Sequence, residues 1–221
     1  MSLKKRAWLN TAIFIPTVCL LIFLPAGTFA YWQAWVLLAL MVVTGAVISA
    51  YFRRNDPALL ERRMRVREKE RPQKVIAPLL YGLLATTVVV ASLDHRMHWS
   101  ADLPLLAVAG DVLFVTGSYV YFAVLRKNSF AGATVQIDAG QQVISTRPYA
   151  IVRHPMYDGL LLCCLGIALA LGSYWASLLV IPICALIVFR LRNEEALLVR
   201  RLPGYTEYCA NVRWRLIPWL Y

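Results

Sequence analysis

Long apolar runs constrain the fold of this chain more than any other feature of its sequence. Four of them cover roughly Ala7–Ala26, Tyr31–Phe52, Val75–Leu93 and Leu103–Leu125. Each run is long enough to cross a bilayer core of about 30 Å as a helix that rises about 1.5 Å per residue. The first run also fits a cleaved signal peptide, but its length and the spans that follow it favour a retained span.

A fifth apolar stretch, Gly159–Phe189, is longer than a single span requires. The turn-like segment Leu171–Trp175 interrupts it. This pattern predicts a helical hairpin with two short arms, which dip into the membrane or cross it obliquely. We therefore expect an all-α fold: a polytopic membrane helix bundle of four spans plus a C-terminal helical hairpin.

The distribution of cations predicts the orientation of these spans. The chain has 23 Lys and Arg against 12 Asp and Glu. Arg96 lies on one side of the predicted spans, and all the other Lys and Arg residues lie on the opposite side. The others lie in Lys4–Arg6, Arg53–Lys74, Arg126–Arg153 and Arg190–Arg215. Positive charge gathers on the cytoplasmic side, so both termini are expected there. A nucleic-acid-binding domain would not segregate its charge in this way, whereas a basic loop such as Arg53–Lys74 suits anionic lipid heads.

Two cytoplasmic segments concentrate the polar residues in which chemistry is expected. Arg126–Gly159 ends in Arg-His-Pro-Met-Tyr-Asp-Gly, and Arg190–Tyr221 begins with a helical pattern that carries the adjacent carboxylates Glu194 and Glu195. A juxtamembrane lipid anchor and a salt-bridged helix end are the structural alternatives. The five cysteines show no C-x2-C spacing, so we expect no metal site.

These motifs resemble the isoprenylcysteine carboxyl methyltransferase family, within a wider group of small membrane methyltransferases that includes phospholipid N-methyltransferases. The resemblance runs from about Asn128 to Pro218. Within this range it rests in addition on Gly204-Tyr205-x-x-Tyr208 and on a Leu-Ile-Pro ending. It implies methyl transfer from S-adenosylmethionine, bound in a cytoplasmic pocket, to a lipid-like acceptor that enters from the membrane. It also implies two units, an N-terminal four-helix membrane region over 1–125 and a methyltransferase core over 126–221.

The resemblance assigns roles to individual residues. The stretch Gln141–Tyr149 matches the family's cofactor loop, although eukaryotic members usually have His where this chain has Gln141 and Gly where it has Arg147. The implied cofactor-binding residues are Gln141, Val143, Ile144, Tyr149, Arg153, His154, Pro155, Tyr157 and Glu194. The implied catalytic residues, which would order the site and orient the acceptor or the cofactor, are Arg190 and Glu195. A carboxylate acceptor needs a cation to position it, and Arg126 is a candidate for this role beside Arg190.

Several functions remain open from the sequence. Carboxyl O-methylation comes first, because the resemblance is closest to that branch of the family. A carboxylate acceptor is also ionised at neutral pH and needs no base. Phospholipid N-methylation is the alternative and would need a proton acceptor such as Glu195 or water. A transporter, a non-catalytic scaffold and a nicotinamide-dependent membrane reductase are further alternatives. Asp111, inside the fourth run, has either a substrate role or a structural role, with Thr116 and Ser118 as candidate partners. The oligomeric state stays open.

Overall fold

The computed structural model describes residues 3–65 and 68–221 and contains helices but no strand in that part of the chain. Arg67 of the predicted basic loop, like the side chains of residues 3–8, lies outside this description. The helices are α1 (Leu3–Ala26), α2 (Trp32–Asn55), α3 (Pro57–Arg63), α4 (Gln73–Met97), α5 (Pro104–Lys127), α6 (Pro155–Ala170), α7 (Tyr174–Ser177), α8 (Val180–Arg201) and α9 (Tyr205–Asn211). The all-α prediction is confirmed.

Within the described residues, five helical segments are long and apolar enough to cross a membrane. Four match the predicted spans, and the fifth is Tyr174–Arg201, which joins α7 and α8. The predicted hairpin exists, but its arms are unequal, so the expectation of two short arms is wrong for the second. α6 has 16 residues, which gives a length of about 24 Å, less than the hydrocarbon thickness of about 30 Å.

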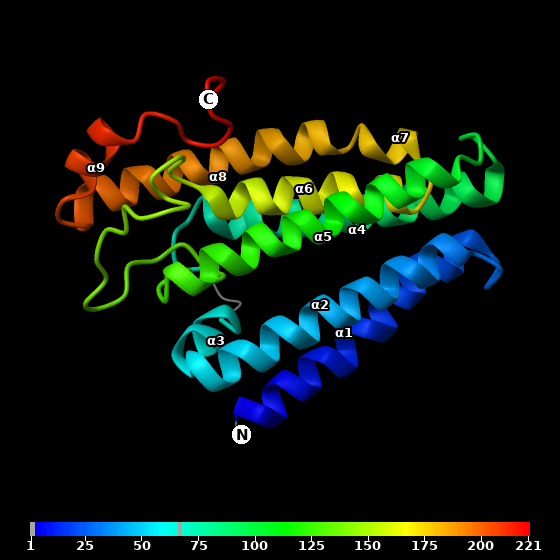
Figure 1. The fold of residues 1–221 in the computed structure, drawn as a ribbon, viewed down its shortest axis with the longest axis horizontal. Coiled ribbons are helices and arrows are strands. Elements are labelled where there is room, and N and C mark those ends of the chain that lie inside the picture. The colour runs from blue at the N-terminus through cyan, green and yellow to red at the C-terminus, as the bar shows by residue number, and fades with distance from the viewer. Residues whose placement is uncertain (1–2, 66–67) are drawn as a thin grey trace.

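The segments that carry the cations gather at one end of the bundle. Figure 1 shows α3, α9 and the loop between α5 and α6 at the same end, whereas the turns α1–α2, α4–α5 and α6–α7 lie at the other. One face of the membrane would therefore receive most of the positive charge, as the sequence predicts. That this face is cytoplasmic, and that both termini are cytoplasmic, remain predictions.

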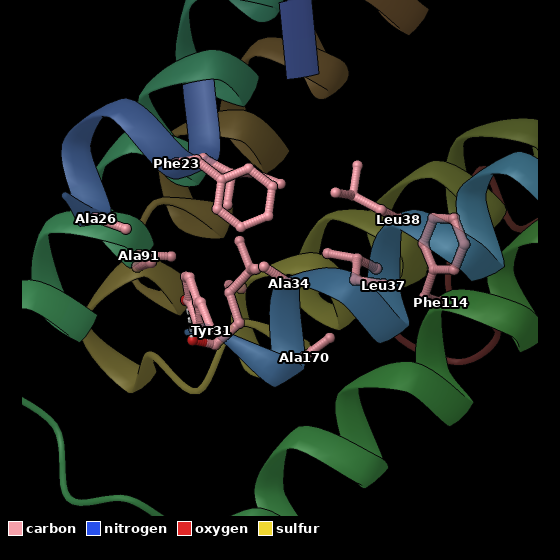
Figure 2. Packing of buried hydrophobic residues seen from close by; sticks show 13 residues of the cluster. Phe23, Ala26, Tyr31, Ala34, Leu37, Leu38, Ala91, Phe114 and Ala170 are labelled. Atoms are coloured by element: carbon pink, nitrogen blue, oxygen red, sulfur yellow. Dashed lines mark hydrogen bonds between the residues drawn. The ribbon is translucent and has the colours of Figure 1, made fainter. Parts of the chain in front are cut away.

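Apolar packing joins the first two helices to the rest of the bundle. Phe23 of α1 and Leu37 of α2 pack in one cluster with Phe114 of α5 and Ala170 of α6 (Figure 2). The Tyr31 hydroxyl, just before α2, donates to the carbonyl of Leu171 at 2.6 Å. This contact ties the start of α2 to the turn of the C-terminal hairpin.

The closest helix pair is α5 with α6, and glycines make its approach possible. A Cβ on Gly110 would overlap the backbone nitrogen of Ala170, and one on Gly166 would lie 2.5 Å from the backbone nitrogen of Phe114. α5 belongs almost entirely to the predicted unit 1–125, and α6 belongs to the predicted unit 126–221. The two predicted units therefore pack directly against each other. The division into two units stays a prediction.

Asp111 of α5 does not find the partners that its sequence neighbours suggested. Thr116 donates to the carbonyl of Val112, and Ser118 lies against the Cys163 sulfur. One carboxylate oxygen of Asp111 is buried without a hydrogen-bond partner among the described residues. Its role therefore stays open.

Candidate functional site

A cavity lies at the cationic end of the bundle, where the loop between α5 and α6 meets α8 and α9. It encloses about 840 Å³, including the space at its open mouth. All nine residues predicted to bind the cofactor line it, namely Gln141, Val143, Ile144, Tyr149, Arg153, His154, Pro155, Tyr157 and Glu194. The structure thus brings these residues together, and we call this space the loop cavity.

The start of α6 fixes Arg153 and His154 at the edge of the loop cavity. Pro155 is the first residue of α6, a position that suits proline because the amide there has no helical partner. The backbone amides of Arg153 and His154 donate to the carbonyls of Trp214 and Arg215, each at 2.9 Å. The C-terminal segment therefore holds the backbone of the Arg-His pair against the body of the protein.

Glu195 lies behind this pair and organises it. Its Oε1 contacts Nε2 of His154 and Nη1 of Arg153, each at 3.2 Å, and its Oε2 accepts from Nε of Arg215 at 2.7 Å. The carboxylate is buried and does not line the loop cavity. Glu195 is therefore a positioning residue, which fixes the side chains that do face the cavity.

Arg190, five residues before Glu195, occupies a second buried network. Its Nε donates to the Tyr157 hydroxyl at 3.1 Å, and its Nη2 pairs with Glu68 Oε1 at 2.7 Å. Its Nη1 donates to Oε1 of Gln73 at 2.8 Å. The Tyr157 hydroxyl in turn donates to Oε2 of Glu194 at 2.7 Å. Arg190 therefore positions Tyr157 and, through it, the Glu194 carboxylate.

A second cavity, of about 740 Å³, lies beside the first and reaches in among the membrane helices. Leu80 and Leu84 of α4, Tyr121 of α5 and Leu160 of α6 supply much of its lining. We call it the membrane cavity. Six residues line both cavities and form what we call the shared wall: Gly132, Thr134, Val135, Met156, Tyr157 and Glu194. The two spaces therefore meet at the residues that carry the polar network.

The structure does not bring Arg126 to the other predicted catalytic residues. Its side chain is exposed, with the guanidinium carbon 5.6 Å from the ring centre of Tyr51 and 5.7 Å from that of Phe122. It lines neither cavity. At the end of α5 its cation is better satisfied over aromatic rings at the helix surface than in a site.

Sequence reasoning missed four residues that the structure places at the site. Arg63, Glu68 and Gln73 belong to the basic loop that was assigned to lipid contact, and Thr134 lies in a segment without a motif. Glu68 carried a signal, because it is an acid inside a run of cations. Its buried pairing with Arg190 explains why an acid stands there.

Burial keeps the tyrosines of the loop cavity protonated. It raises the pKa of Tyr149 to about 12, although the hydrogen bond from Asn128 opposes the rise. Burial also raises the pKa of Tyr205 and Tyr208 well above the usual range. The Tyr208 hydroxyl donates to the carbonyl of Tyr149 at 2.7 Å, which fixes the cofactor loop against α9.

In the network around Glu195, the hydrogen bond that Arg215 donates to this carboxylate raises the pKa of the Arg215 guanidinium.

The described residues offer no site for a metal ion, because no group of three or more His, Cys, Asp and Glu side chains among them could hold one.

Comparison with known proteins assigns this region to a family. Residues 105–203 match the model of the family described as phospholipid methyltransferase. The match covers less than half of the chain and shows similarity of this segment to that family. It covers the shared wall, α6 and α8 but not Arg63, Glu68 or Tyr205, so the match includes only part of the described site. The wider group of this family also contains the isoprenylcysteine carboxyl methyltransferases.

A relative of a different description also matches. Delta(14)-sterol reductase TM7SF2 of Mus musculus is 30% identical over 160 residues, which cover 65% of this chain and 38% of the reductase. The chain therefore spans less than half the length of this curated relative. The family match and this relative have descriptions that name different reactions, so neither assigns a reaction or a substrate to this chain.

Proposed function

We propose that this protein transfers a methyl group from S-adenosylmethionine to a lipid-like acceptor, with a carboxylate as the methylated group. The observation that carries the proposal is the shared wall, where a polar cavity open at the cationic end meets a cavity among membrane helices. A polar donor and an apolar acceptor could enter from different sides and meet there.

The loop cavity offers the groups that such a donor requires. Arg153 suits the carboxylate of the amino-acid end of S-adenosylmethionine. Glu194 suits the ammonium and sulfonium groups of the same molecule, because a carboxylate attracts cations. The Tyr205 hydroxyl is buried and has no hydrogen-bond partner within the described ranges, so it is available to a ligand. Leu197, Leu198 and Tyr149 supply apolar and aromatic surface for the base. The residues present therefore fit this cofactor.

The chemistry asks little of the protein beyond placement. When bound, S-adenosylmethionine supplies a methyl group already activated by its sulfonium. The chain's own residues then have to orient the acceptor and exclude water, which accounts for most of the rate enhancement in a displacement of this kind. Tyr157, held between Arg190 and Glu194, keeps the Glu194 carboxylate at the shared wall.

Arg63 supports a carboxylate as the acceptor group. Its guanidinium lines the membrane cavity and donates to the carbonyl of Gly132 at 2.6 Å. Within the described part of the chain it forms no ion pair, in contrast to Arg190, which pairs with Glu68. An uncompensated cation in this cavity favours an anionic group. A carboxylate that is already ionised needs no proton acceptor.

N-methylation of a phospholipid amine is the alternative that the matched family's description favours. An amine has to lose a proton, and Glu194 at the shared wall is the carboxylate placed to accept it. The two products differ chemically, because a methyl ester is cleaved by base and an N-methyl group is not.

The experiment uses protein in lipid nanodiscs with labelled S-adenosylmethionine and two acceptors, N-acetyl-S-farnesylcysteine and phosphatidylethanolamine. We expect base-labile label on the first acceptor, reduced at least tenfold by Arg63→Gln. The exposed Arg54→Gln of α2 is the matched control and should retain full activity. Base-stable label on the phospholipid would replace O-methylation with N-methylation, and no transfer to either acceptor would contradict the proposal.

A reductase function is the second candidate, because the sterol reductase of Mus musculus shares 30% identity with this chain. It predicts binding of a nicotinamide cofactor to the loop cavity in place of S-adenosylmethionine. Titration with NADPH and with S-adenosylhomocysteine separates the two functions before any acceptor is known.

The protein is an integral membrane protein, and we propose that its cationic end faces the cytoplasm. There the exposed arginines of α2 and the following loop would contact anionic lipid heads, each cation contributing about 1 kcal/mol. Accessibility of single cysteines introduced at Arg54 and at Met97, tested from each side of a sealed vesicle, checks the orientation.

A further inference from the structure

The backbone around Thr134 is fixed on both sides by side chains from distant parts of the chain. Arg63 donates to the carbonyl of Gly132 at 2.6 Å, and Arg190 donates to the carbonyl of Ala133 at 3.1 Å. The amide of Val135 donates to Oε2 of Glu68 at 2.9 Å. A loop has no helical or sheet hydrogen bonds of its own, so these three contacts determine where Thr134 points.

The Thr134 side chain is buried in the shared wall, 8% exposed, and lines both cavities. Its hydroxyl oxygen has no hydrogen-bond partner among the residues that the structure describes. Such a group is costly, because a buried hydroxyl gives up its bonds to water without replacing them.

Three other buried Thr and Ser hydroxyls in the described part of the chain have partners. Those of Thr87 and Ser92 donate to carbonyls of their own helix, each at 2.9 Å, and that of Ser173 contacts Asp94. Thr134 thus differs from these three buried residues. Three side chains hold its backbone in place, yet its hydroxyl is left free at the wall between two cavities.

The charges nearby indicate which ligand atom the hydroxyl meets. Arg63 and Arg190 both line the membrane cavity and both donate to the loop next to Thr134. Glu68 compensates Arg190, whereas Arg63 has no ion-pair partner in the described ranges. Glu194 also lines the membrane cavity, where its carboxylate accepts from Tyr157, but the side chains of this cavity that bond the Thr134 loop are the cations Arg63 and Arg190. These two cations favour an anionic oxygen beside the loop, and a hydroxyl donor strengthens its binding.

We propose that the Thr134 hydroxyl donates a hydrogen bond to an anionic oxygen of the acceptor head group and so selects carboxylate acceptors. The inference rests on the proposed function, because it takes the membrane cavity as the acceptor site. Glu68 acts as a positioning residue, since it holds the amide of Val135 and the guanidinium of Arg190 together.

The test measures binding without the cofactor, so that its outcome does not depend on methyl transfer. N-acetyl-S-farnesylcysteine and its methyl ester are titrated separately into the protein in nanodiscs, and S-adenosylhomocysteine is titrated in a third experiment. For Thr134→Val we expect the Kd of the carboxylate to rise about tenfold, the size of one hydrogen bond to a charged group. The Kd values of the methyl ester and of S-adenosylhomocysteine should stay within about twofold of the wild type.

Two further variants and a stability measurement complete the design. Thr134→Ser restores the hydroxyl and should restore carboxylate binding. Thr116→Val, on an exposed face of α5, removes a hydroxyl outside both cavities and should change neither ligand's Kd. The Tm of Thr134→Val should equal or exceed that of the wild type, because the lost hydroxyl had no protein partner.

Three results would overturn the inference. An unchanged carboxylate Kd in Thr134→Val would show that the hydroxyl does not touch the acceptor. A matching loss of S-adenosylhomocysteine affinity would assign it to the loop cavity instead, and a lowered Tm would assign it a structural role. Failure of the wild type to bind S-adenosylhomocysteine, with carboxylate selectivity intact, would contradict the proposed methyltransferase function but not the contact made by Thr134.

Discussion

Glu194 and Glu195 are adjacent in sequence, yet the structure gives them separate tasks, and replacing each with Gln should separate stability from ligand binding. Glu194 lines both cavities and accepts one hydrogen bond, from Tyr157. Glu195 lines neither cavity and contacts Arg153, His154 and Arg215. Both substitutions preserve size and remove one charge, so each is the control for the other.

The contacts set the expected magnitudes. Glu195→Gln leaves Arg153, whose side chain is 9% exposed, without its carboxylate partner. Breaking a buried ion pair from one side costs about 3–5 kcal/mol, and the pair with Arg215, which is 37% exposed, adds at most about 1 kcal/mol. Glu194→Gln keeps an acceptor oxygen for Tyr157, so its cost should be about 1 kcal/mol.

The assay is equilibrium unfolding in mixed micelles, paired with titration of S-adenosylhomocysteine into the folded protein. We expect Glu195→Gln to lose several times more unfolding free energy than Glu194→Gln. In the folded protein, Glu194→Gln should weaken ligand binding about tenfold, as expected for a lost charged contact. Equal losses of stability, or a larger loss for Glu194→Gln, would refute the assignment of structural support to Glu195.

Three further predictions follow from packing, pairing and ionisation. Gly110→Ala should destabilise the protein by about 1–3 kcal/mol or more, because the added Cβ would meet the α6 backbone. Gly82→Ala on α4 has open space around the added Cβ and should be neutral or stabilising in the same unfolding assay. Glu68→Ala should cost about 3–5 kcal/mol, since it leaves the Arg190 charge buried and unpaired; a loss under about 1 kcal/mol would show that the pair contributes little. The pKa of Tyr149 is raised in the folded state, so its contribution to stability is complete below pH 10 and disappears as the pH rises through about 12; unfolding free energies compared at pH 9 and pH 11 should therefore fall less in Tyr149→Phe than in the wild type.

Hydropathy predicted most of the architecture, and the family resemblance predicted residues that line the loop cavity. A membrane span is a local property of about 20 residues, so the four N-terminal spans could be read directly from composition. The residues predicted to bind the cofactor lie near the two ends of the hairpin, and a hairpin returns the chain to its starting point. All nine therefore line one cavity.

The length of the second arm depended on contacts that hydropathy does not record. The apolar run ends at Phe189, but the helix continues to Arg201. The helical pattern after Arg190 predicts this continuation, but not the buried partners of opposite charge that Arg190 and Glu195 find, which offset the cost of burying them. Those partners, Glu68 and Arg153, are far away in the sequence.

The shared wall was also beyond the reach of local patterns. Arg63 and Thr134 are separated by about 70 residues, and neither belongs to a motif. The cations of the 53–74 region were assigned together to lipid contact, although Arg63 and the acid Glu68 face inward to hold the loop around Thr134. Arg126 was predicted as a cation that positions the acceptor carboxylate, and its exposed side chain beside Tyr51 gives that role no support.

Calorimetric titration of the wild-type protein in nanodiscs with S-adenosylhomocysteine, alongside NADPH, tests the central claim most directly. We expect a micromolar Kd for S-adenosylhomocysteine, no heat of binding for NADPH, and loss of the first signal in His154→Ala, which removes a side chain from the loop cavity. Binding of NADPH alone by a folded sample would contradict the methyltransferase account and favour the reductase.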